Sequence, residues 1–363
     1  MIKRLVILFL ASILLTGCTS NKQEEIIFSS WGSITEVKIL NKIINDFEKE
    51  NPNINVKFIH IPQNYFQKLH LLFASNTAPD VLFINNLNLP IYESKLEDLT
   101  NLVQQEEFFP QSIAGLKYKN KLLAIPRDIS NLVFYINLDI ADLPDEEWSI
   151  DALYENAKKY TNDSHWGISC EQDIYWALPY LSYFNGGILD EKFNTIIDSK
   201  ESKQAISLYK SLYEKYNYAP TRSQVGSSTL AQMFLDKKIV FYLSGRWMYP
   251  KISEKADFSW AVINFPVGKN PQPSDCSGWA ISKDSKHKEA SKKFVKFLSD
   301  EKSSKYFTET GLIVPARMNI AKNIVSEKHN ESAFIKAIEI SKPTPVNKNY
   351  KKMIDEINIK YFK

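Results

Sequence analysis

Residues 26–58, IIFSSWGSITEVKILNKIINDFEKENPNINVKF, decide the fold. The apolar triplet 26–28 predicts a buried strand, and the polar loop after it leads into Ser33 and Glu36, an S-x-x-E capping box that starts a helix. Apolar residues then recur at helical spacing until Asn51-Pro52 ends the helix, and alternation over 54–58 predicts a second strand. The stretch therefore predicts a strand–helix–strand unit.

The next segments continue the same order. Residues 65–74 predict a helix and the apolar run 81–84 predicts a third strand. This wiring indicates an α/β fold with a mainly parallel sheet that is covered on both faces. In such sheets ligands bind beyond the carboxyl ends of the strands, which here are residues 29–33 and 85–88. The N-terminus of the helix at Ser33 would direct free N–H groups into the same crevice.

The rest of the chain repeats the alternation of strands and helices. The loop 244–247 follows a predicted buried strand, and the turn-rich stretch 268–275 predicts a crossing between domains. We expect strands over 132–136, 166–168, 239–243, 260–263 and 278–282, and helices over 148–160, 199–216, 228–236, 290–298, 331–341 and 350–361.

The first 25 residues predict an export signal and a tether. A basic start is followed by an apolar run that is too short to span a bilayer, which is typical of a signal peptide. The sequence L-T-G-C at 15–18 resembles the bacterial lipobox, and this resemblance implies cleavage after residue 17 and lipid on Cys18. The alternative is an ordinary cleavable signal in which Cys18 is incidental. Residues 18–25 are polar and predict a lipidated tether to the cell membrane.

Composition excludes several classes of protein. The chain has 363 residues, 45 Lys+Arg and 42 Asp+Glu, so it lacks the basic surface that a nucleic-acid partner requires. The length is comfortable for two domains. No C-x-x-C or paired histidine motif occurs, which argues against a zinc site, and we expect Cys170 and Cys276 to be independent thiols.

Several segments, in this order, carry a resemblance to a known family. They are Trp31 and Glu36 ahead of FEKENPNINVKF (47–58), APDVLF (78–83), residues 124–137, WSIDALYENAKKYT (148–161), NGG (185–187), FLDKKIVFYLSGRW (234–247), SGWAISKDSKHKEASKKFVKFLS (277–299) and residues 311–315. Nearly end to end, the chain resembles the extracellular solute-binding proteins of family 1, which deliver ligands to ABC importers. Two departures concern the ligand geometry: Ser277-Gly278 replaces Gly-Gly, and Tyr135-Ile136-Asn137 replaces Tyr-Asn.

The resemblance implies a two-lobed, type II periplasmic-binding-protein (Venus-flytrap) fold with several hinge crossings. We place lobe 1 at residues 26–126 plus 276–315 and lobe 2 at residues 130–268 plus 316–363. The implied mechanism is hinge closure, in which a ligand that touches both lobes stabilises the closed form, and a permease then reads the changed outer surface. A monomer without a cofactor or a metal ion is expected.

Carbohydrate chemistry selects the candidate ligand-binding residues. A sugar needs flat aromatic surfaces for its C–H faces and planar polar groups for its hydroxyls. For each candidate the alternative is a structural role, as core packing, helix capping or an ion pair between lobes. The aromatic candidates are Trp31, Tyr65, Tyr175, Trp176, Trp247 and Trp279, and the polar candidates are Asp80, Asn85, Arg127, Asp128, Arg246 and Asp275.

Three other functions compete with solute transport. A surface glycoside hydrolase would need two facing carboxylates, but the chain has no G-x-S-x-G, Walker A or H-E-x-x-H segment, so we expect no enzyme. A receptor module would bind ligand without transport. Tyrosines such as Tyr180 and Tyr183 could bind ferric iron, although the sequence offers no second tyrosine cluster.

Overall fold

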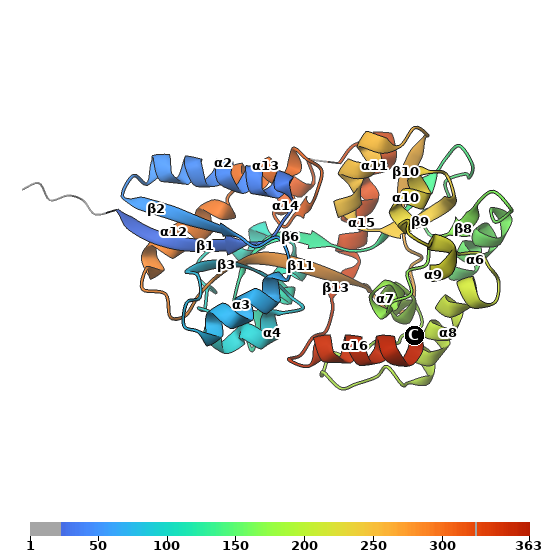
Figure 1. The fold of residues 1–363 in the computed structure, drawn as a ribbon, viewed down its shortest axis with the longest axis horizontal. Helices are drawn as coiled ribbons and strands as arrows, with labels where there is room; N and C mark the ends of the chain where they lie inside the picture. The colour runs from blue at the N-terminus through green and yellow to red at the C-terminus, as the bar shows by residue number, and fades with distance from the viewer. Residues whose placement is uncertain (1–22, 324) are drawn as a thin grey trace, which may run out of the picture.

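The computed structural model shows two α/β halves that lie side by side along the long axis of the molecule (Figure 1). It describes residues 23–323 and 325–363. The predicted signal peptide, 1–17, and the lipidation residue Cys18 lie outside the described residues. Glu24 and Glu25, which were expected in the tether, are already part of the first strand.

The first half is built on a seven-stranded sheet with the order β12-β6-β11-β3-β1-β2, in which β13 pairs with β11. As expected, β1 is parallel to both β2 and β3. The whole sheet is mixed, however, because β11 inserts antiparallel between β3 and β6. The strands are β1 (Glu24–Ser30), β2 (Ile54–His60), β3 (Val81–Asn85), β6 (Ile125–Ser130), β11 (Gln272–Ile281), β12 (Val314–Pro315) and β13 (Ser341–Pro343).

Helix α2 begins as the sequence predicts. The side chain of Ser33 accepts a hydrogen bond from the backbone N–H of Glu36, and the Glu36 carboxylate accepts one from the backbone N–H of Ser33. The apolar face of α2 packs into the core, where the Phe47 ring lies 4.9 Å from the ring of Phe294. The helices of this half are α2 (Ile34–Glu50), α3 (Tyr65–Ala74), α4 (Leu89–Tyr92), α5 (Pro110–Gly115), α12 (Lys288–Leu298), α13 (Glu301–Thr308) and α14 (Met318–Ala321).

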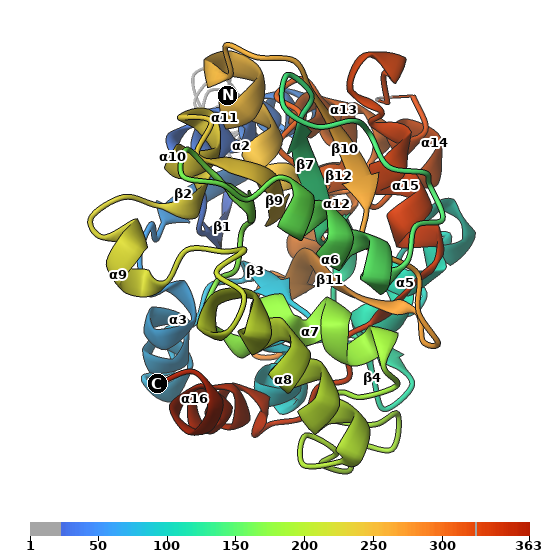
Figure 2. The same ribbon diagram turned by 90° about the vertical axis from the view of Figure 1, so that its right-hand side faces the viewer.

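The second half is built on a four-stranded sheet with the order β10-β7-β9-β8. Figure 2 faces this half and shows α6, α7 and α8 on its outer side. Phe134, Phe241 and Phe265 form the centre of its aromatic core. The elements are β7 (Val133–Asn137), β8 (Trp166–Ile168), β9 (Ile239–Ser244), β10 (Trp260–Asn264), α6 (Ile150–Lys159), α7 (Ile174–Tyr183), α8 (Lys200–Glu214), α9 (Arg222–Val225), α10 (Leu230–Leu235), α11 (Tyr249–Lys255), α15 (Ser332–Glu339) and α16 (Tyr350–Tyr361).

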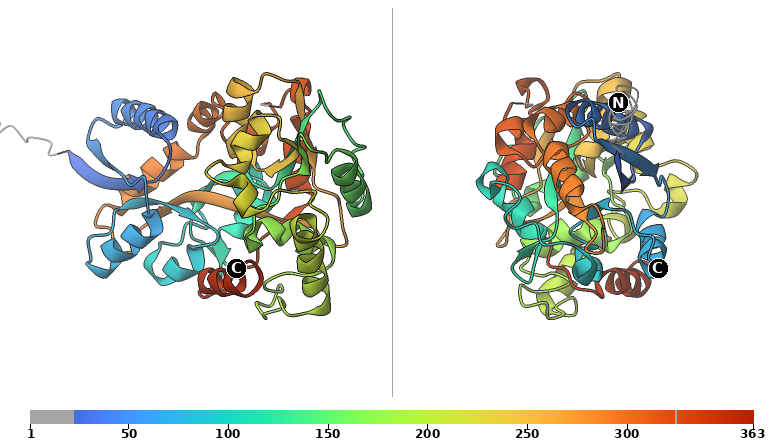
Figure 3. Two further views of the ribbon diagram at one scale, coloured as in Figure 1. Left: turned by 45° about the vertical axis from the view of Figure 1, so that its right-hand side comes forward. Right: turned by 90° about the vertical axis from the view of Figure 1, so that its left-hand side faces the viewer.

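Strand β11 begins at the crossing from the second half, at Gln272, and runs into the first half, where it ends at Ile281 beside β3 (Figure 3). The sequence predicted a loop over 268–275, but Gln272 to Ser274 pair with β13, and Asp275 pairs with Ser130 of β6. Long-range pairing has therefore overridden the local turn signals. The lobe boundaries stay a prediction, and two segments of the range 316–363 lie against the larger sheet: α14 contacts β12, and β13 pairs with β11.

The two described cysteines are free and buried in different cores, which confirms that they are independent thiols. Cys170 belongs to the core of the second half, and Cys276 lies on β11.

Gly278 marks a close approach between β11 and β6, next to a register shift of the two strands between Ser277 and Gly278. A Cβ atom at position 278 would lie 2.4 Å from the carbonyl oxygen of Ile125. Backbone cannot move away as a side chain can, so only glycine fits here without displacing a central strand.

We predict that Gly278→Ala destabilises the protein by about 1–3 kcal/mol, because the added methyl group forces β6 and β11 apart. Urea unfolding followed by circular dichroism measures this difference. Gly187→Ala is the control, since its Cβ would approach the flexible Ile196 side chain and a carbonyl no closer than 3.3 Å. Equal unfolding free energies for the two variants would contradict the prediction.

Candidate ligand-binding site

A cavity of about 420 Å³ lies between the two halves. It is lined by the ends of β1, β3 and β6 from the first half, by the end of β9 and by α7 from the second, and by the middle of β11. This is the position that the predicted α/β wiring favours for a ligand. Eight predicted residues line it: Trp31, Asn85, Arg127, Asp128, Tyr175, Arg246, Trp247 and Asp275.

Trp31 stands directly after β1 and is 45% exposed. One edge of the indole contacts the first half, where its ring lies 5.8 Å from the ring of Phe83. Gly32, with a φ of +138°, allows the chain to turn into the cap of α2. An indole with this much exposed surface adds little to the core, so its flat face is free for a ligand.

Trp247 follows β9 in the second half, within the 3-10 turn η3 (Arg246–Met248), and is 37% exposed. Its ring lies 6.5 Å from the ring of Trp176 on α7. Gly245 is needed beside it, since a Cβ there would lie 2.0 Å from the indole. The cavity thus receives one exposed indole from each half.

Arg127 lies on β6 and is held from two sides. Its Nη2 donates to Glu36 at 3.1 Å and its Nε donates to Asp128 at 2.6 Å. Ser277 donates to the same Asp128 carboxylate at 2.7 Å. Burial works to lower the pKa of the guanidinium, but the Asp128 and Glu36 carboxylates together outweigh it and raise this pKa. The Nη1 atom of Arg127 has no hydrogen-bond partner among the described residues.

Arg246 repeats this arrangement in the second half. Its Nη2 donates to Glu331 at 2.9 Å, and its Nε donates to the carbonyl oxygen of Gly311 at 3.1 Å. Tyr249 donates to the second oxygen of Glu331 at 2.6 Å. The contact with Gly311 joins the end of β9 to the loop before β12, so this arginine also bridges the two halves.

Asp275 lies where β11 crosses between the halves. It accepts hydrogen bonds from Asn86 at 3.0 Å, from Tyr175 at 3.0 Å and from Thr344 at 2.9 Å. Removal from water raises the pKa of this carboxyl, and the three hydrogen bonds only partly offset that effect. The donors come from the first half, from α7 and from the segment after β13.

The two arginines of the cavity are paired with carboxylates of the protein, whereas Asp275 is held by uncharged donors. Arg127 faces two carboxylates and Arg246 faces one, so neither cation is left for an anionic ligand. Beside them the lining offers indoles, aliphatic side chains and amide or hydroxyl groups. This combination suits an uncharged ligand with apolar faces and a hydroxylated edge.

Four predicted residues do not line this cavity, and for Trp279 we correct the assignment. Trp279 is fully buried between Phe28 and Phe83, because its side of β11 faces the core. Asp80 and Tyr65 make structural hydrogen bonds: Asp80 accepts from Ile27 and Ser285, and the buried Tyr65 bonds to Ser29. Trp176 is partly buried and packs beside Trp247 without lining the cavity.

Sequence reasoning missed the partners of the two arginines. Glu36 was noted in the capping box and in the family resemblance but not as a partner of Arg127, which its second oxygen holds. Ser277 was noted as a departure from Gly-Gly without a role. Glu331 lies 85 residues from Arg246 along the chain, and no local pattern links the two.

Comparison with known proteins identifies the family. The model of the bacterial extracellular solute-binding protein family matches residues 42–334, which is most of the chain. The chain belongs to this family. As a member, it is a solute-binding protein that acts outside the cytoplasm, and the proteins it resembles are binding proteins rather than enzymes.

Individual relatives fit this assignment. The chain is 24% identical over 350 residues to the galactooligosaccharide-binding protein of Bacillus subtilis, covering 90% of this chain and 81% of that one. Two solved structures share the fold. One is an ABC substrate-binding protein from Listeria monocytogenes in complex with cycloalternan, with a TM-score of 0.84, 24% identity and coverage of 93% and 92%. The other is the GacH receptor of Streptomyces glaucescens, with a TM-score of 0.81 and 23% identity. The match covers 93% of this chain and 92% of that one.

Within residues 23–323 and 325–363, no three His, Cys, Asp or Glu side chains are grouped so that they could hold a metal ion. Over the same ranges no helix is both long enough and apolar enough to cross a bilayer.

We predict that Asp275 makes the protein less stable as the pH rises above 4. The pKa of Asp275 is raised in the folded state above the ordinary value of 3.8, so just above pH 4 the folded protein binds more protons than the unfolded chain. The free energy of unfolding therefore falls as the pH rises. In Asp275→Asn this loss disappears. The melting temperature of both proteins between pH 4 and pH 7 measures the difference.

The control for this measurement is Asp284→Asn, which changes an exposed carboxylate in the same way. It should follow the wild-type profile. Parallel profiles for the wild type and Asp275→Asn would show that Asp275 ionises as an ordinary aspartate.

Proposed function

We propose that the protein captures an uncharged oligosaccharide in the cavity between its halves and delivers it to the permease of an ABC importer. The observation that carries this proposal is the pair of exposed indoles, Trp31 and Trp247, which come from opposite halves and line the same cavity. Stacking on both faces of a sugar ring requires such a pair.

Two further observations support a neutral sugar. The cavity arginines are already paired, so an acidic ligand would gain no free cation. The Bacillus subtilis relative is named for galactooligosaccharides, and the Listeria structure holds cycloalternan. In our proposal Asn85, Arg127, Asp128, Arg246 and Asp275 bind the hydroxyl edge, and Tyr175 binds beside the rings.

Closure of the two halves completes the site. A ligand that contacts Trp31 and Trp247 together has more contacts when the halves are close, so it shifts the equilibrium towards the closed form by that difference in affinity. The crossings at β6, β11 and β12 are the segments that would bend, within lobes 26–126 plus 276–315 and 130–268 plus 316–363. The protein would act as a monomer without enzymatic activity.

We predict that Trp31→Ala and Trp247→Ala each weaken oligosaccharide binding by about 2 kcal/mol, or roughly thirtyfold in Kd, because each removes a stacking surface. A thermal-shift screen of galacto- and malto-oligosaccharides identifies the ligand, and isothermal titration calorimetry measures its Kd. Phe193→Ala, which removes an exposed ring outside the cavity, is the control and should bind normally.

The result that overturns the cleft assignment is a ligand whose Kd neither tryptophan variant changes. Chromatography of the same sugars after prolonged incubation separates binding from hydrolysis, and we expect them intact.

We also propose that lipid on Cys18 holds the protein at the membrane, near its permease, and so raises its effective concentration there. Cys18→Ser should release the protein into the soluble fraction and abolish labelling by a palmitate analogue. Cys170→Ala, which removes a buried thiol, should keep both properties. Membrane retention of Cys18→Ser would contradict the proposal.

A further inference from the structure

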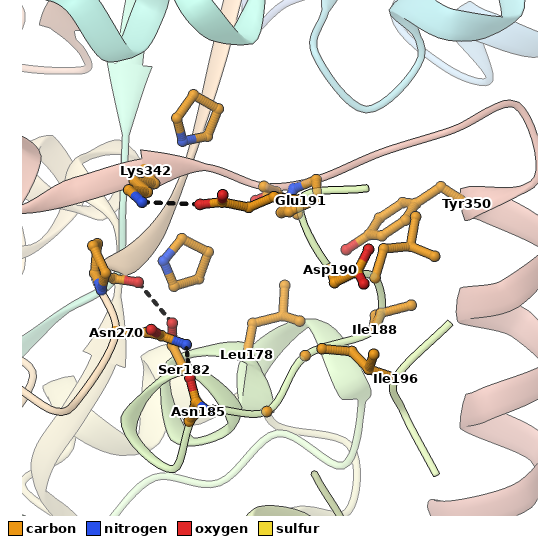
Figure 4. Close-up of a pocket in the computed structure, with 18 residues that line it drawn as sticks. Leu178, Ser182, Asn185, Ile188, Asp190, Glu191, Ile196, Asn270, Lys342 and Tyr350 are labelled. Carbon is orange, nitrogen blue, oxygen red and sulfur yellow. Dashed lines mark hydrogen bonds and ion pairs between the residues drawn. The ribbon is translucent and has the colours of Figure 1, made fainter. Parts of the chain in front are cut away.

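A second cavity, of about 400 Å³, lies at the hinge and takes no part in the proposed function (Figure 4). One wall comes from the second half, through the end of α7 and the loop 185–191. The opposite wall comes from the two crossing segments, 270–273 and 342–345. The cavity therefore lies between parts of the chain whose relative position changes when the halves move.

The walls of this hinge cavity are mostly apolar. Leu178, Ile188 and Ile196 line one side, and four prolines, at positions 271, 273, 343 and 345, stand on the other. Proline has no N–H, so this wall offers carbonyl oxygens and few donors. A ligand with an apolar body that donates hydrogen bonds fits these walls better than one that accepts them.

A buried hydroxyl faces this space without a partner. Tyr350 is 4% exposed, and its hydroxyl has no hydrogen bond to any described residue. In Figure 4 the hydroxyl points towards the cavity. Burial raises the pKa of Tyr350, so the phenol stays uncharged at ordinary pH and can accept or donate a hydrogen bond. An unpartnered buried hydroxyl is costly, and a ligand would remove that cost.

The rim of the hinge cavity is negatively charged. Asp190 and Glu191 contribute two carboxylates, and Lys342 contributes one ammonium group, 2.9 Å from Glu191. The lining residues alone carry a balance of one negative charge, which Lys192 beside Asp190 partly offsets. This charge attracts a cation and repels an anion.

The same elements also line the cleft cavity. On α7, Leu178 and Ser182 face the hinge cavity, whereas Tyr175, one turn earlier, lines the cleft. On β11, Pro273 lines one cavity and Asp275 the other. Thr344 lines the hinge cavity and donates to Asp275. A ligand that holds the hinge walls in one position therefore also fixes the position of Tyr175 and Asp275.

We propose that the hinge cavity is a second ligand site, which takes a small organic cation with an apolar body and is coupled to the cleft. The ammonium group binds at the Asp190–Glu191 rim, and the body packs on the prolines. Coupling is reciprocal: if the cation changes the affinity of the cleft for its ligand, that ligand changes the affinity for the cation by the same factor.

Three probes with one skeleton test the charge: 2-phenylethylamine, 2-phenylethanol and phenylacetate, titrated into the mature protein and followed by protein-observed NMR. We expect the amine to bind most tightly and phenylacetate least. Binding of phenylacetate as tight as that of the amine, or no shift of resonances from residues 185–191 with the amine, overturns the proposal. This titration uses no sugar, so its outcome is independent of the proposed function.

Two exposed charges give effects of opposite sign. Glu191→Gln should weaken amine binding about fivefold, and Lys342→Gln should strengthen it by a similar factor, because each changes the rim by one charge. Glu155→Gln, an exposed carboxylate on α6, is the matched control and should have no effect. The site is contradicted if Glu191→Gln and Glu155→Gln change the affinity for the amine equally. It is also contradicted if Glu191→Gln and Lys342→Gln change this affinity in the same direction.

Tyr350→Phe tests the floor of the cavity. It should weaken amine binding about fivefold and leave the melting temperature of the free protein unchanged or higher, since no hydrogen bond is lost on folding. Unchanged binding, or a lower melting temperature that shows a hidden partner, overturns the role of the hydroxyl. For the coupling, the Kd of a cleft oligosaccharide should differ with and without saturating amine, and an identical Kd overturns it.

Discussion

The two halves of the protein meet at the carboxylate of Asp275. It accepts hydrogen bonds from Asn86 in the first half, from Tyr175 in the second and from Thr344 after β13. A carboxylate withdrawn from water is stable only when donors surround it, so all three donors must be in place together. Since they come from three distant parts of the chain, this one residue fixes how the crossing strand, the two sheets and the two indoles stand relative to one another.

The two arginines of the cleft are likewise buried groups whose burial is offset by partners from the protein. A buried guanidinium without a carboxylate would be expensive, and Arg127 and Arg246 each obtain one from a different element. The pairing leaves the cleft polar, with the charge of each arginine already matched by a carboxylate. The proposed preference for uncharged ligands would thus be a consequence of how the fold stabilises its own charges.

The fold could be predicted from the sequence largely because patterns among neighbouring residues determine the first elements of the first half. The capping box at Ser33, the stop at Asn51 and the alternation in β2 are all properties of a few neighbouring residues. The antiparallel insertion of β11 and the early start of this strand at Gln272 depend on pairing with strands far away in the chain, and turn residues there pointed to a loop.

The site was predictable to a similar extent and for the same reason. Loops at the carboxyl ends of strands are visible in the sequence, so Trp31 and Trp247 could be expected beside the cavity that they line. Which face of β11 points inwards is not visible, so Trp279 was placed in the cleft although it belongs to the core. Glu331 and the hinge cavity were missed because they depend on segments that only the folded chain brings together.

The location of the two indoles on separate halves also affects how long a ligand stays bound. In the proposed mode a guest clamped between them can escape only after the halves part, so the lifetime of the complex follows the opening rate of the protein. Additional hydroxyl contacts would then slow escape chiefly by making the shut form harder to leave. The sugar that binds most tightly need not be the one that is released to the permease fastest. If opening of the two halves is the slowest step, it would limit the transport rate of the importer.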